Sequence, residues 1–208
     1  SRSSAALACR LTGSSSTSST RPPLMRVTAS PATATCRPAA AGGTTGSPKL
    51  AQHQHRNQLC AAAGAACMYG ASERDVIVNG FPLFHVAGSF VYGLSMFLVG
   101  GTVVLPTLLG MRSTDFVQRY WRFAEREKAT LLAAVPTVMS SLLTVPADGV
   151  DISRVRALLT GGSPLQPDLA QAFERRFGIP VRNILGMTEC GGIIAIEPCA
   201  MPRTPGSV

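Results

Sequence analysis

Charged residues and closely paired cysteines are scarce in this chain. Lys, Arg, Asp and Glu make up 14% of the 208 residues, whereas hydrophobic residues make up 46%. This balance excludes a wholly disordered polyelectrolyte, which combines low hydrophobicity with high net charge. None of the six cysteines belongs to a C-x-x-C pair, so the pattern does not indicate a small fold stapled by disulfides, and we expect a reducing, cytoplasmic compartment. A globular or a membrane class remains.

Acidic residues are absent from the first third of the chain. Residues 1–72 contain seven Lys or Arg and no Asp or Glu, whereas residues 73–208 contain twelve basic and eleven acidic residues. Almost all of the formal net charge of +8 therefore lies in the first part. Because the larger part is nearly neutral and shows no basic face, we expect no nucleic-acid partner.

Residues 1–40 lack hydrophobic periodicity. Ser and Thr account for 15 of them and Arg for five, so the segment cannot bury enough apolar surface to offset the entropy of ordering. We expect a disordered Ser/Thr/Arg-rich leader here, with no strand at residues 37–40, and a separate folded unit over residues 41–208. The composition leaves three origins open: an organellar transit peptide, a flexible tail, or a stretch translated from a wrong reading frame.

The rest of the chain alternates short apolar runs with amphipathic stretches. The apolar runs are typical of strands and lie at residues 76–79, 102–105, 130–133, 155–159 and 181–185. The amphipathic stretches predict helices at residues 113–128, 136–144 and 167–177. Strands that alternate with helices pair in parallel through right-handed crossovers. We therefore expect an α/β fold, with a layered, mainly parallel sheet and flanking helices.

Residues 86–105 raise a membrane alternative. No Asp, Glu, Lys or Arg occurs among these twenty residues, which have the length of a transmembrane helix. Against a span, Gly100 and Gly101 interrupt the run, the residues that follow them are β-branched, and no cluster of Lys or Arg flanks either end. A buried helix over residues 86–99, followed by a buried strand, explains the same residues, and we expect no membrane span.

A loop rich in Gly, Ser and Thr provides the first chemical signal. In order, it reads Gly42, Gly43, Thr44, Thr45, Gly46, Ser47, Pro48 and Lys49. Glycines let backbone N–H groups approach a phosphate, hydroxyls donate hydrogen bonds to it, and lysine supplies a cation. The loop is not a Walker A motif, because Pro48 precedes Lys49 and Leu50 follows it. A solvated turn is the alternative interpretation.

The string G-G-T-T-G-S-P-K resembles the phosphate loop of the adenylate-forming superfamily, the AMP-forming acyl-CoA synthetases and their relatives. Further stretches resemble family motifs in the same order: H-R-N at residues 55–57, P-L-F-H-V-A-G at 82–88, G-G-S-P-L at 161–165 and G-M-T-E at 186–189. The resemblance implies part of the large N-terminal domain of an AMP-forming acid–thiol ligase. Within the superfamily it favours the acyl-CoA synthetase branch.

The resemblance also implies which residues bind the nucleotide. Residues 42–49 would hold the β- and γ-phosphates of ATP, with Lys49 as the cation. Thr188 would contact the α-phosphate, and Glu189 would help to hold Mg²⁺, a hard cation that prefers oxygen ligands. The other residues implied in nucleotide binding are Gly161, Gly162, Ser163, Leu185 and Gly186. A capping box formed by Ser163 and Gln166 ahead of a helix is an alternative, or an additional, role for Ser163.

The acyl side of the implied site involves His85, Gly162 and Gly186. His85 resembles the residue that lines the acyl pocket, although a lone His beside apolar residues is also compatible with a structural role. In the implied reaction a carboxylic acid, fatty or aryl, attacks the α-phosphorus of Mg·ATP to give an acyl-adenylate and pyrophosphate. The thiol of coenzyme A then displaces AMP. Lys49, Thr188 and Glu189 would be the catalytic residues, because they position and neutralise phosphate oxygens.

Some features depart from the family pattern. Ala41 stands where a Ser or Thr usually precedes the loop, and Leu185 stands where a Tyr usually stacks on adenine. The family's downstream parts, including a C-terminal domain with a catalytic Lys, have no counterpart before Val208. We therefore expect a central fragment of the large domain, with the C-terminal domain as its partner, that does not complete the reaction alone. The alternative is a fragment that binds nucleotide without turnover.

Overall fold

The computed structural model describes the backbone of residues 36–41, 49–107 and 109–204, and the side chains of those from residue 49 onward. All of these residues lie in one compact unit, Ala34–Val208. The leader up to residue 35, for which we expect disorder, and the loop residues 42–48 lie outside the described residues.

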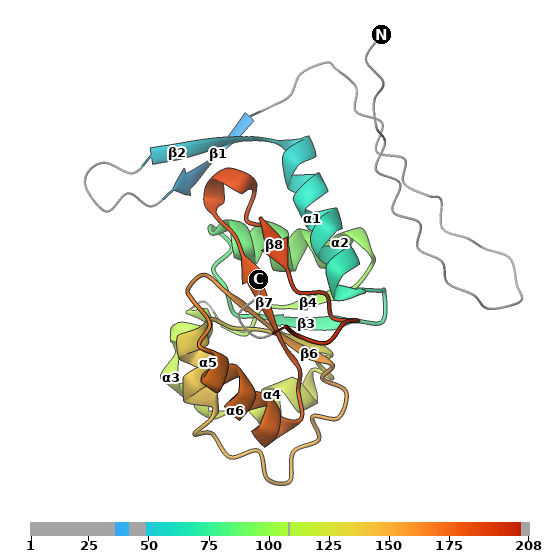
Figure 1. Ribbon diagram of the computed structural model, residues 1–208, viewed down its shortest axis with the longest axis vertical. Coiled ribbons are helices and arrows are strands. Elements are labelled where there is room, and N and C mark those ends of the chain that lie inside the picture. The colour runs from blue at the N-terminus through green and yellow to red at the C-terminus, as the bar shows by residue number, and fades with distance from the viewer. Residues whose placement is uncertain (1–35, 42–48, 108, 205–208) are drawn as a thin grey trace, which may run out of the picture. The chain divides into compact units, whose positions relative to one another are not determined.

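A six-stranded sheet forms the centre of this unit (Figure 1). Its strands are β3 (Val76–Asn79), β4 (Thr102–Val104), β5 (Leu131–Ala133), β6 (Ala157–Gly161), β7 (Val181–Leu185) and β8 (Ala195–Ile196). Their spatial order is β4-β3-β5-β6-β7-β8, and all neighbours are parallel except β7 and β8. The expected α/β fold with a mainly parallel sheet is confirmed.

The central strands are apolar along their length because both faces of the sheet are covered. Adjacent residues of a strand point to opposite faces, and accordingly Ile77 joins one hydrophobic core and Val78 the other. Leu132 on the neighbouring strand β5, and Leu158 on β6 beyond it, belong to the same core as Val78. Burial of both faces removes the polar alternation that a half-exposed strand would show.

Helices cover each face of the sheet in a separate layer (Figure 1). One layer contains α1 (His55–Tyr69), the π-helix η1 (Ala87–Leu94) and α2 (Ser95–Leu98). The other layer contains α3 (Thr114–Gln118), α4 (Tyr120–Arg126), α5 (Pro136–Leu142) and α6 (Pro167–Phe177). Two short 3₁₀ helices, η2 (Gly110–Arg112) and η3 (Thr188–Cys190), lie in the connections.

Several element boundaries differ from the sequence-based predictions. The helix expected over residues 113–128 is divided into α3 and α4 at Arg119, whose φ of −107° and ψ of 9° lie outside the α-helical region. The strand expected at residues 155–159 begins at Ala157 instead, where pairing with β5 starts. Helix α1 was not expected at all.

The uncharged segment 86–105 contains η1, α2 and β4 in succession. Gly100, between the helix and the strand, has a φ of 77°, a backbone conformation that favours glycine. Within the part of the chain that the structure describes, no helix has the length and apolar character needed to cross a membrane. The alternative of a membrane span at these residues is therefore wrong. The expected helix followed by a strand is confirmed, but the expected burial of the strand is wrong, because β4 lies at the edge of the sheet with Thr102 exposed and Val103 and Val104 only half-buried.

A two-stranded antiparallel hairpin lies apart from the main sheet. It consists of β1 (Cys36–Ala41) and β2 (Lys49–Gln54), with Ala41 opposite Lys49. The expectation that residues 37–40 form no strand is wrong. Their Pro and Ala content has a low strand propensity, but pairing with β2 overrides it, since strand formation depends strongly on context.

A partly buried ion pair ties the end of α1 to the amino ends of three strands. Asp75, which precedes β3, accepts hydrogen bonds from Arg156 at 2.9 Å and from the Thr130 hydroxyl at 2.7 Å. Arg156 also donates to the backbone carbonyls of Tyr69 at 2.6 Å and Gly70 at 3.3 Å. Burial raises the pKa of Asp75, but the hydrogen bonds from Arg156 and Thr130 outweigh burial and hold this pKa below its ordinary value.

Candidate functional site

A cavity of about 160 Å³ lies at the carboxyl ends of the parallel strands. In open α/β sheets this edge is where ligands bind. The cavity is lined by residues from the connections that follow β3, β6 and β7. Five residues expected at the site from sequence motifs line it: His85, Gly161, Gly162, Gly186 and Thr188. The fold therefore brings three separate motifs to one place.

Two glycines allow the chain to turn closely around this cavity. A Cβ atom at Gly186 would collide with the carbonyl oxygen of Gly192, so a larger residue would push the two segments apart. Gly162 has a φ of 86°, in the region that favours glycine. Backbone sterics therefore account for part of the glycine pattern in the G-G-S-P-L and G-M-T-E motifs, independently of any ligand.

His85 lines the cavity as a neutral imidazole. Its Nδ1 accepts a hydrogen bond from the backbone N–H of Ala87 at 3.1 Å. Partial burial lowers the pKa of His85 below its ordinary value, so the ring is uncharged near neutral pH. Because Nδ1 is an acceptor, the proton of the neutral ring is on Nε2.

Asn79 holds the segment that carries His85, and sequence reasoning missed it. This residue ends β3 and is buried. Its Nδ2 donates to the carbonyl of Gly88 at 2.8 Å, and its Oδ1 accepts from the N–H of Phe81 at 3.2 Å. The side chain thus joins both ends of the P-L-F-H-V-A-G stretch. The available signal was a single polar residue at the end of the apolar run V-I-V-N.

The β1–β2 hairpin and η3 meet on the phosphate side of the candidate site. Both strands contact η3, which contains Thr188 and Glu189, and Figure 1 shows the hairpin beside this turn. Lys49 is the first residue of β2, and its side chain and that of Glu189 are exposed. Residues 42–48 connect the two strands in the sequence, so both ends of the glycine-rich loop start from strands that lie against η3. The phosphate-site prediction requires this proximity.

The first turn of α1 lies against the same region. The helix begins at His55, directly after β2, and Asn57 Oδ1 accepts a hydrogen bond from the backbone N–H of Gln54 at 3.0 Å. A Cβ atom at Gly191, which follows η3, would lie 3.5 Å from the side chain of Ala61 in α1. The H-R-N and G-M-T-E motifs are therefore neighbours in space. The unpaired N–H groups of a helix N-terminus favour negative charge nearby.

Ser163 and Leu185 occupy the exposed margin of the site. Helix α6 begins at Pro167 and is preceded by Gln166 as its N-cap residue, without a side-chain capping hydrogen bond. The alternative in which Ser163 and Gln166 form a capping box is therefore wrong. The Leu185 side chain, at the carboxyl end of β7, is half exposed, so it offers an aliphatic surface at the position that the resemblance assigns to adenine.

The oxygen donors of η3 fit one kind of magnesium site. Thr188 and Glu189 offer a hydroxyl and a carboxylate on adjacent residues. Among the described residues, no group of three or more His, Cys, Asp or Glu side chains could hold a metal ion. This donor set fits a hard cation that takes one carboxylate from the protein and keeps phosphate and water ligands. It does not fit an ion enclosed by protein ligands alone.

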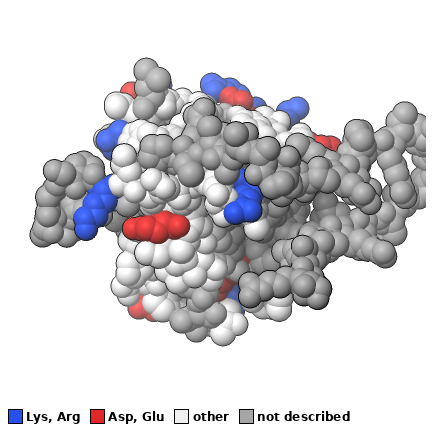
Figure 2. Space-filling view, turned by 90° about the horizontal axis from the view of Figure 1, so that it is seen from above, with Lys and Arg blue, Asp and Glu red and all other residues white. Residues whose placement is uncertain are grey.

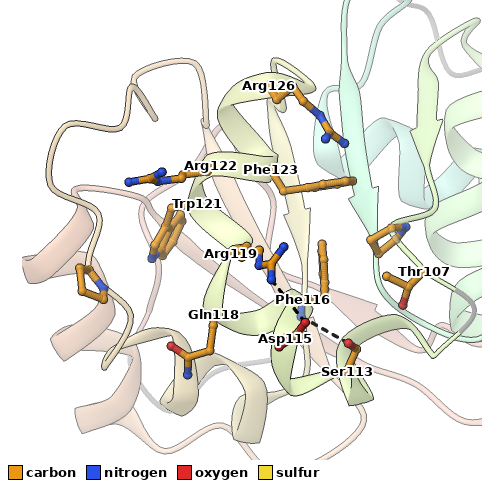
Figure 3. A pocket seen from close by; sticks show the side chains of 12 residues that line it. Thr107, Ser113, Asp115, Phe116, Gln118, Arg119, Trp121, Arg122, Phe123 and Arg126 are labelled. Atoms are coloured by element: carbon orange, nitrogen blue, oxygen red, sulfur yellow. Dashed lines mark hydrogen bonds and ion pairs between the residues drawn. The ribbon is translucent and has the colours of Figure 1, made fainter.

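A larger groove, of about 930 Å³, lies on the other helical layer (Figure 3). Residues of α3 and α4 line most of it, and Phe116 and Phe123 pack edge to face there with ring centroids 5.0 Å apart. Arg119 pairs with Asp115 at 3.5 Å in an exposed position. None of the motif residues that the structure describes lines this groove. The smaller cavity at the strand ends is therefore the better candidate for the functional site.

On the face seen in Figure 2, the charged side chains of the described residues are scattered among uncharged ones and do not gather into a patch where the described surface is visible. Cysteines are similarly dispersed: Cys60, Cys190 and Cys199 carry free thiols, and Cys67 is disulfide-bonded.

Residues 41–208 match the family described as AMP-binding enzyme. Because the match covers most of the chain, this protein belongs to that family, and the resemblance inferred from its motifs is confirmed.

Curated relatives of the chain include two bacterial CoA ligases. The marinolic acid–CoA ligase of Pseudoalteromonas sp. is 34% identical over 173 residues, which cover 80% of this chain and 26% of the relative. The sulfoacetate–CoA ligase of Cupriavidus necator is 32% identical over 164 residues, which cover 79% of this chain and 30% of the relative. The chain therefore spans about a quarter to a third of the length of these relatives.

Solved structures agree with this assignment. ATP-bound MatB from Rhodopseudomonas palustris matches with a TM-score of 0.68 at 25% sequence identity, over 82% of this chain and 32% of that chain. The O-succinylbenzoate coenzyme A synthetase of Bacillus subtilis, in complex with AMP, matches with a TM-score of 0.66 at 29% identity, over 78% of this chain and 32% of that chain.

Proposed function

We propose that this chain forms the nucleotide-binding part of an AMP-forming acid–thiol ligase, which activates a carboxylic acid with ATP and transfers it to coenzyme A. One observation carries the proposal: η3 contacts both strands that flank the glycine-rich loop, and the segment before η3 lines the cavity beside the other motifs. The residues proposed to bind phosphate and the cavity proposed for the acyl group would then share one edge of the sheet. The relatives named as CoA ligases support the reaction class.

Three side chains carry the phosphate side of the proposed site. Lys49 supplies positive charge, and the Thr188 hydroxyl donates a hydrogen bond to the α-phosphate. The Glu189 carboxylate would help to hold a magnesium ion, which would supply neutralisation of charge on the phosphate oxygens. Residues 42–47 contribute backbone N–H groups and hydroxyls to the β- and γ-phosphates. Ser163 and Leu185 lie on the adenine side.

The cavity beside His85, Gly161 and Gly186 receives the acyl group. In the first step, a carboxylate oxygen of the acid bonds to the α-phosphorus, and the bond from that phosphorus to pyrophosphate breaks. In the second step, the thiol of coenzyme A loses its proton to solvent and its sulfur bonds to the acyl carbon. The bond from that carbon to the phosphate oxygen of AMP breaks, and AMP leaves. Positioning and neutralisation of charge on phosphate oxygens account for the first step.

A C-terminal domain of the intact enzyme is the proposed partner for the second step. The alternative, a nucleotide-binding fragment without turnover, is favoured by the half-exposed Leu185, which replaces an aromatic face with an aliphatic one. Acid-dependent exchange of labelled pyrophosphate into ATP separates the two, because only a domain that forms acyl-adenylate incorporates the label. The cytoplasmic location stays a prediction from the sequence.

Calorimetric titration of the chain with Mg·ATP tests the nucleotide site. Glu189→Gln keeps the shape of the side chain and removes its charge, and we expect it to weaken Mg·ATP binding about tenfold, as for loss of one charge-assisted contact. Asp115→Asn is the matched control, because this exposed carboxylate lies on α3 and outside the site. Equal effects of the two substitutions, or no binding of Mg·ATP by the unaltered chain, would contradict the proposal.

A further inference from the structure

We infer that the acyl side of this site accepts a small uncharged group, of which benzoyl is a representative, and excludes acids with a second anionic group or a long chain. The inference rests on the proposed function, because it assigns the acyl class of the same site. The charge, the walls and the size of the cavity carry it.

The cavity offers no cation to a second anionic group. None of the described residues that line it is Lys or Arg. His85 is the one lining side chain that could become positive, and its Nδ1 is already used as an acceptor by the N–H of Ala87. Partial burial also lowers the pKa of His85. A second carboxylate or a sulfonate would therefore lose its hydration without gaining a charged partner, which is strongly unfavourable.

Two aromatic rings form part of the cavity wall. Phe81 and Tyr92 lie with their ring centroids 4.9 Å apart and their planes inclined at 36°. An aryl group beside such a pair can make the offset or edge-to-face contacts that aromatic rings prefer. Val86, Val91 and Ile184 continue the wall with aliphatic surface. The wall chemistry therefore suits a planar hydrocarbon group.

The volume of the cavity limits the length of the acyl group. At about 160 Å³ it is close to an engineered cavity of about 150 Å³ in another protein that binds benzene. Val91, Tyr92 and Ile184 are buried members of the core beneath α1. A longer chain would have to displace these packed side chains, and protein cores resist such insertion.

Binding of acyl-adenylate analogues by the 208-residue chain tests this inference. In these analogues a sulfamate replaces the reactive phosphate, so that binding is measured without turnover. Titration calorimetry with the benzoyl, succinyl and palmitoyl analogues compares an aryl group, a second carboxylate and a long chain, and AMP reports the nucleotide site alone. We expect the benzoyl analogue to bind about tenfold or more tightly than each of the other three ligands.

A substitution in the cavity tests whether the cavity wall causes the expected preference for the benzoyl analogue. Ala87 lines the cavity at the start of η1, and Ala87→Leu is expected to weaken the benzoyl analogue about tenfold while leaving AMP binding unchanged. Ala63→Leu is the matched control, because Ala63 is exposed on α1. Circular dichroism establishes that both variants are folded before titration.

The outcomes separate the inference from the proposed function. Should the chain bind AMP but bind the succinyl or palmitoyl analogue as tightly as the benzoyl analogue, the inference is wrong and the proposed function stands. A benzoyl preference that Ala87→Leu leaves intact would likewise overturn the assignment to this cavity. If neither AMP nor any analogue binds, the proposed function fails and the inference fails with it.

Discussion

Replacing Asp75 with asparagine tests the ion pair that ties α1 to the sheet. The substitution keeps the shape of the side chain and removes its charge. It turns the hydrogen bonds from Arg156 at 2.9 Å and Thr130 at 2.7 Å into weaker ones, and it leaves the guanidinium without its anionic partner. The Asp75 side chain is 8% exposed, so water replaces little of the lost interaction on that side.

The structure sets the size of the expected loss. A hydrogen bond to a charged group contributes about 1.5–3 kcal/mol, roughly twice the contribution of a neutral one. The Arg156 side chain is 34% exposed and retains access to water, so its loss of a partner costs less than it would in a closed core. We therefore expect Asp75→Asn to lower the free energy of unfolding by about 2 kcal/mol.

Urea unfolding measures this change directly. The chain has a single tryptophan, Trp121, which is buried, so its fluorescence reports loss of the core. The midpoint should fall while the slope of the free energy against urea stays the same. Asp115→Asn is the control, because the exposed Asp115–Arg119 pair is 3.5 Å long and such pairs contribute well under about 1 kcal/mol. Equal losses in the two variants would refute the reasoning.

The pH dependence of the difference provides a second test. Burial raises the pKa of Asp75, but hydrogen bonds from Arg156 and Thr130 outweigh burial, so the folded-state pKa lies below the unfolded value. The charged carboxylate therefore contributes stability above about pH 3.9, and this contribution is lost as the pH falls through the folded-state pKa. A stability difference between the unaltered chain and Asp75→Asn that grows on acidification would contradict this assignment.

Three further predictions concern the site. Gly186→Ala should destabilise the fold by about 1–3 kcal/mol, because the added methyl group would collide with a backbone carbonyl. Gly64→Ala is the control: Gly64 lies in a helix with open space around it, so this substitution should stabilise the fold by about 0.5–1 kcal/mol. We expect the urea midpoint to fall in the first variant and to rise in the second. Asn79→Ala should weaken the benzoyl analogue more than AMP in calorimetry, since its two hydrogen bonds hold the acyl-side segment. In an NMR titration the His85 ring should show a pKa below about 6.5, because partial burial disfavours its charged form; a midpoint above that value would contradict the neutral cavity.

Elements with a strong local pattern were predictable from the sequence. Strands β3 and β7 are apolar runs of four and five residues whose bounds agree with the prediction. Helix α6 also agrees, because Pro167 begins it and Gly178, with a φ of 67°, ends it.

Elements that depend on close packing or on distant partners were not predictable. Helix α1 buries Ala62, Ala65 and Ala66 against its neighbours, and alanine is too weakly hydrophobic to mark a helical face in the sequence. Strand β1 forms through its pairing with β2, and the residues of β1 alone do not predict this pairing. Such contacts become visible only when the segments meet.

The candidate site shows the same division. The motif residues His85, Gly161 and Thr188 could be selected from strings of adjacent letters, and the structure places them around one cavity. The aromatic wall of the cavity could not be predicted from the sequence, because Phe81 and Tyr92 are indistinguishable there from ordinary core residues. Asn79 donates a hydrogen bond to Gly88, nine residues further along the chain, and hydrophobic periodicity does not predict a contact of this kind.

By itself the sequence determined the α/β class, the family and most residues proposed to bind phosphate, because hydrophobic period and motif spacing are local properties of the chain. Only the tertiary structure decided that the β1–β2 hairpin lies against η3. It also decided that the cavity proposed for the acyl group is small, has two aromatic rings in its wall and has no lining Lys or Arg among the described residues. Those properties arise where strands that are far apart in the chain end at one edge of the sheet. There the packing of neighbouring side chains, rather than the order of residues in the sequence, sets the volume and the charge of the cavity.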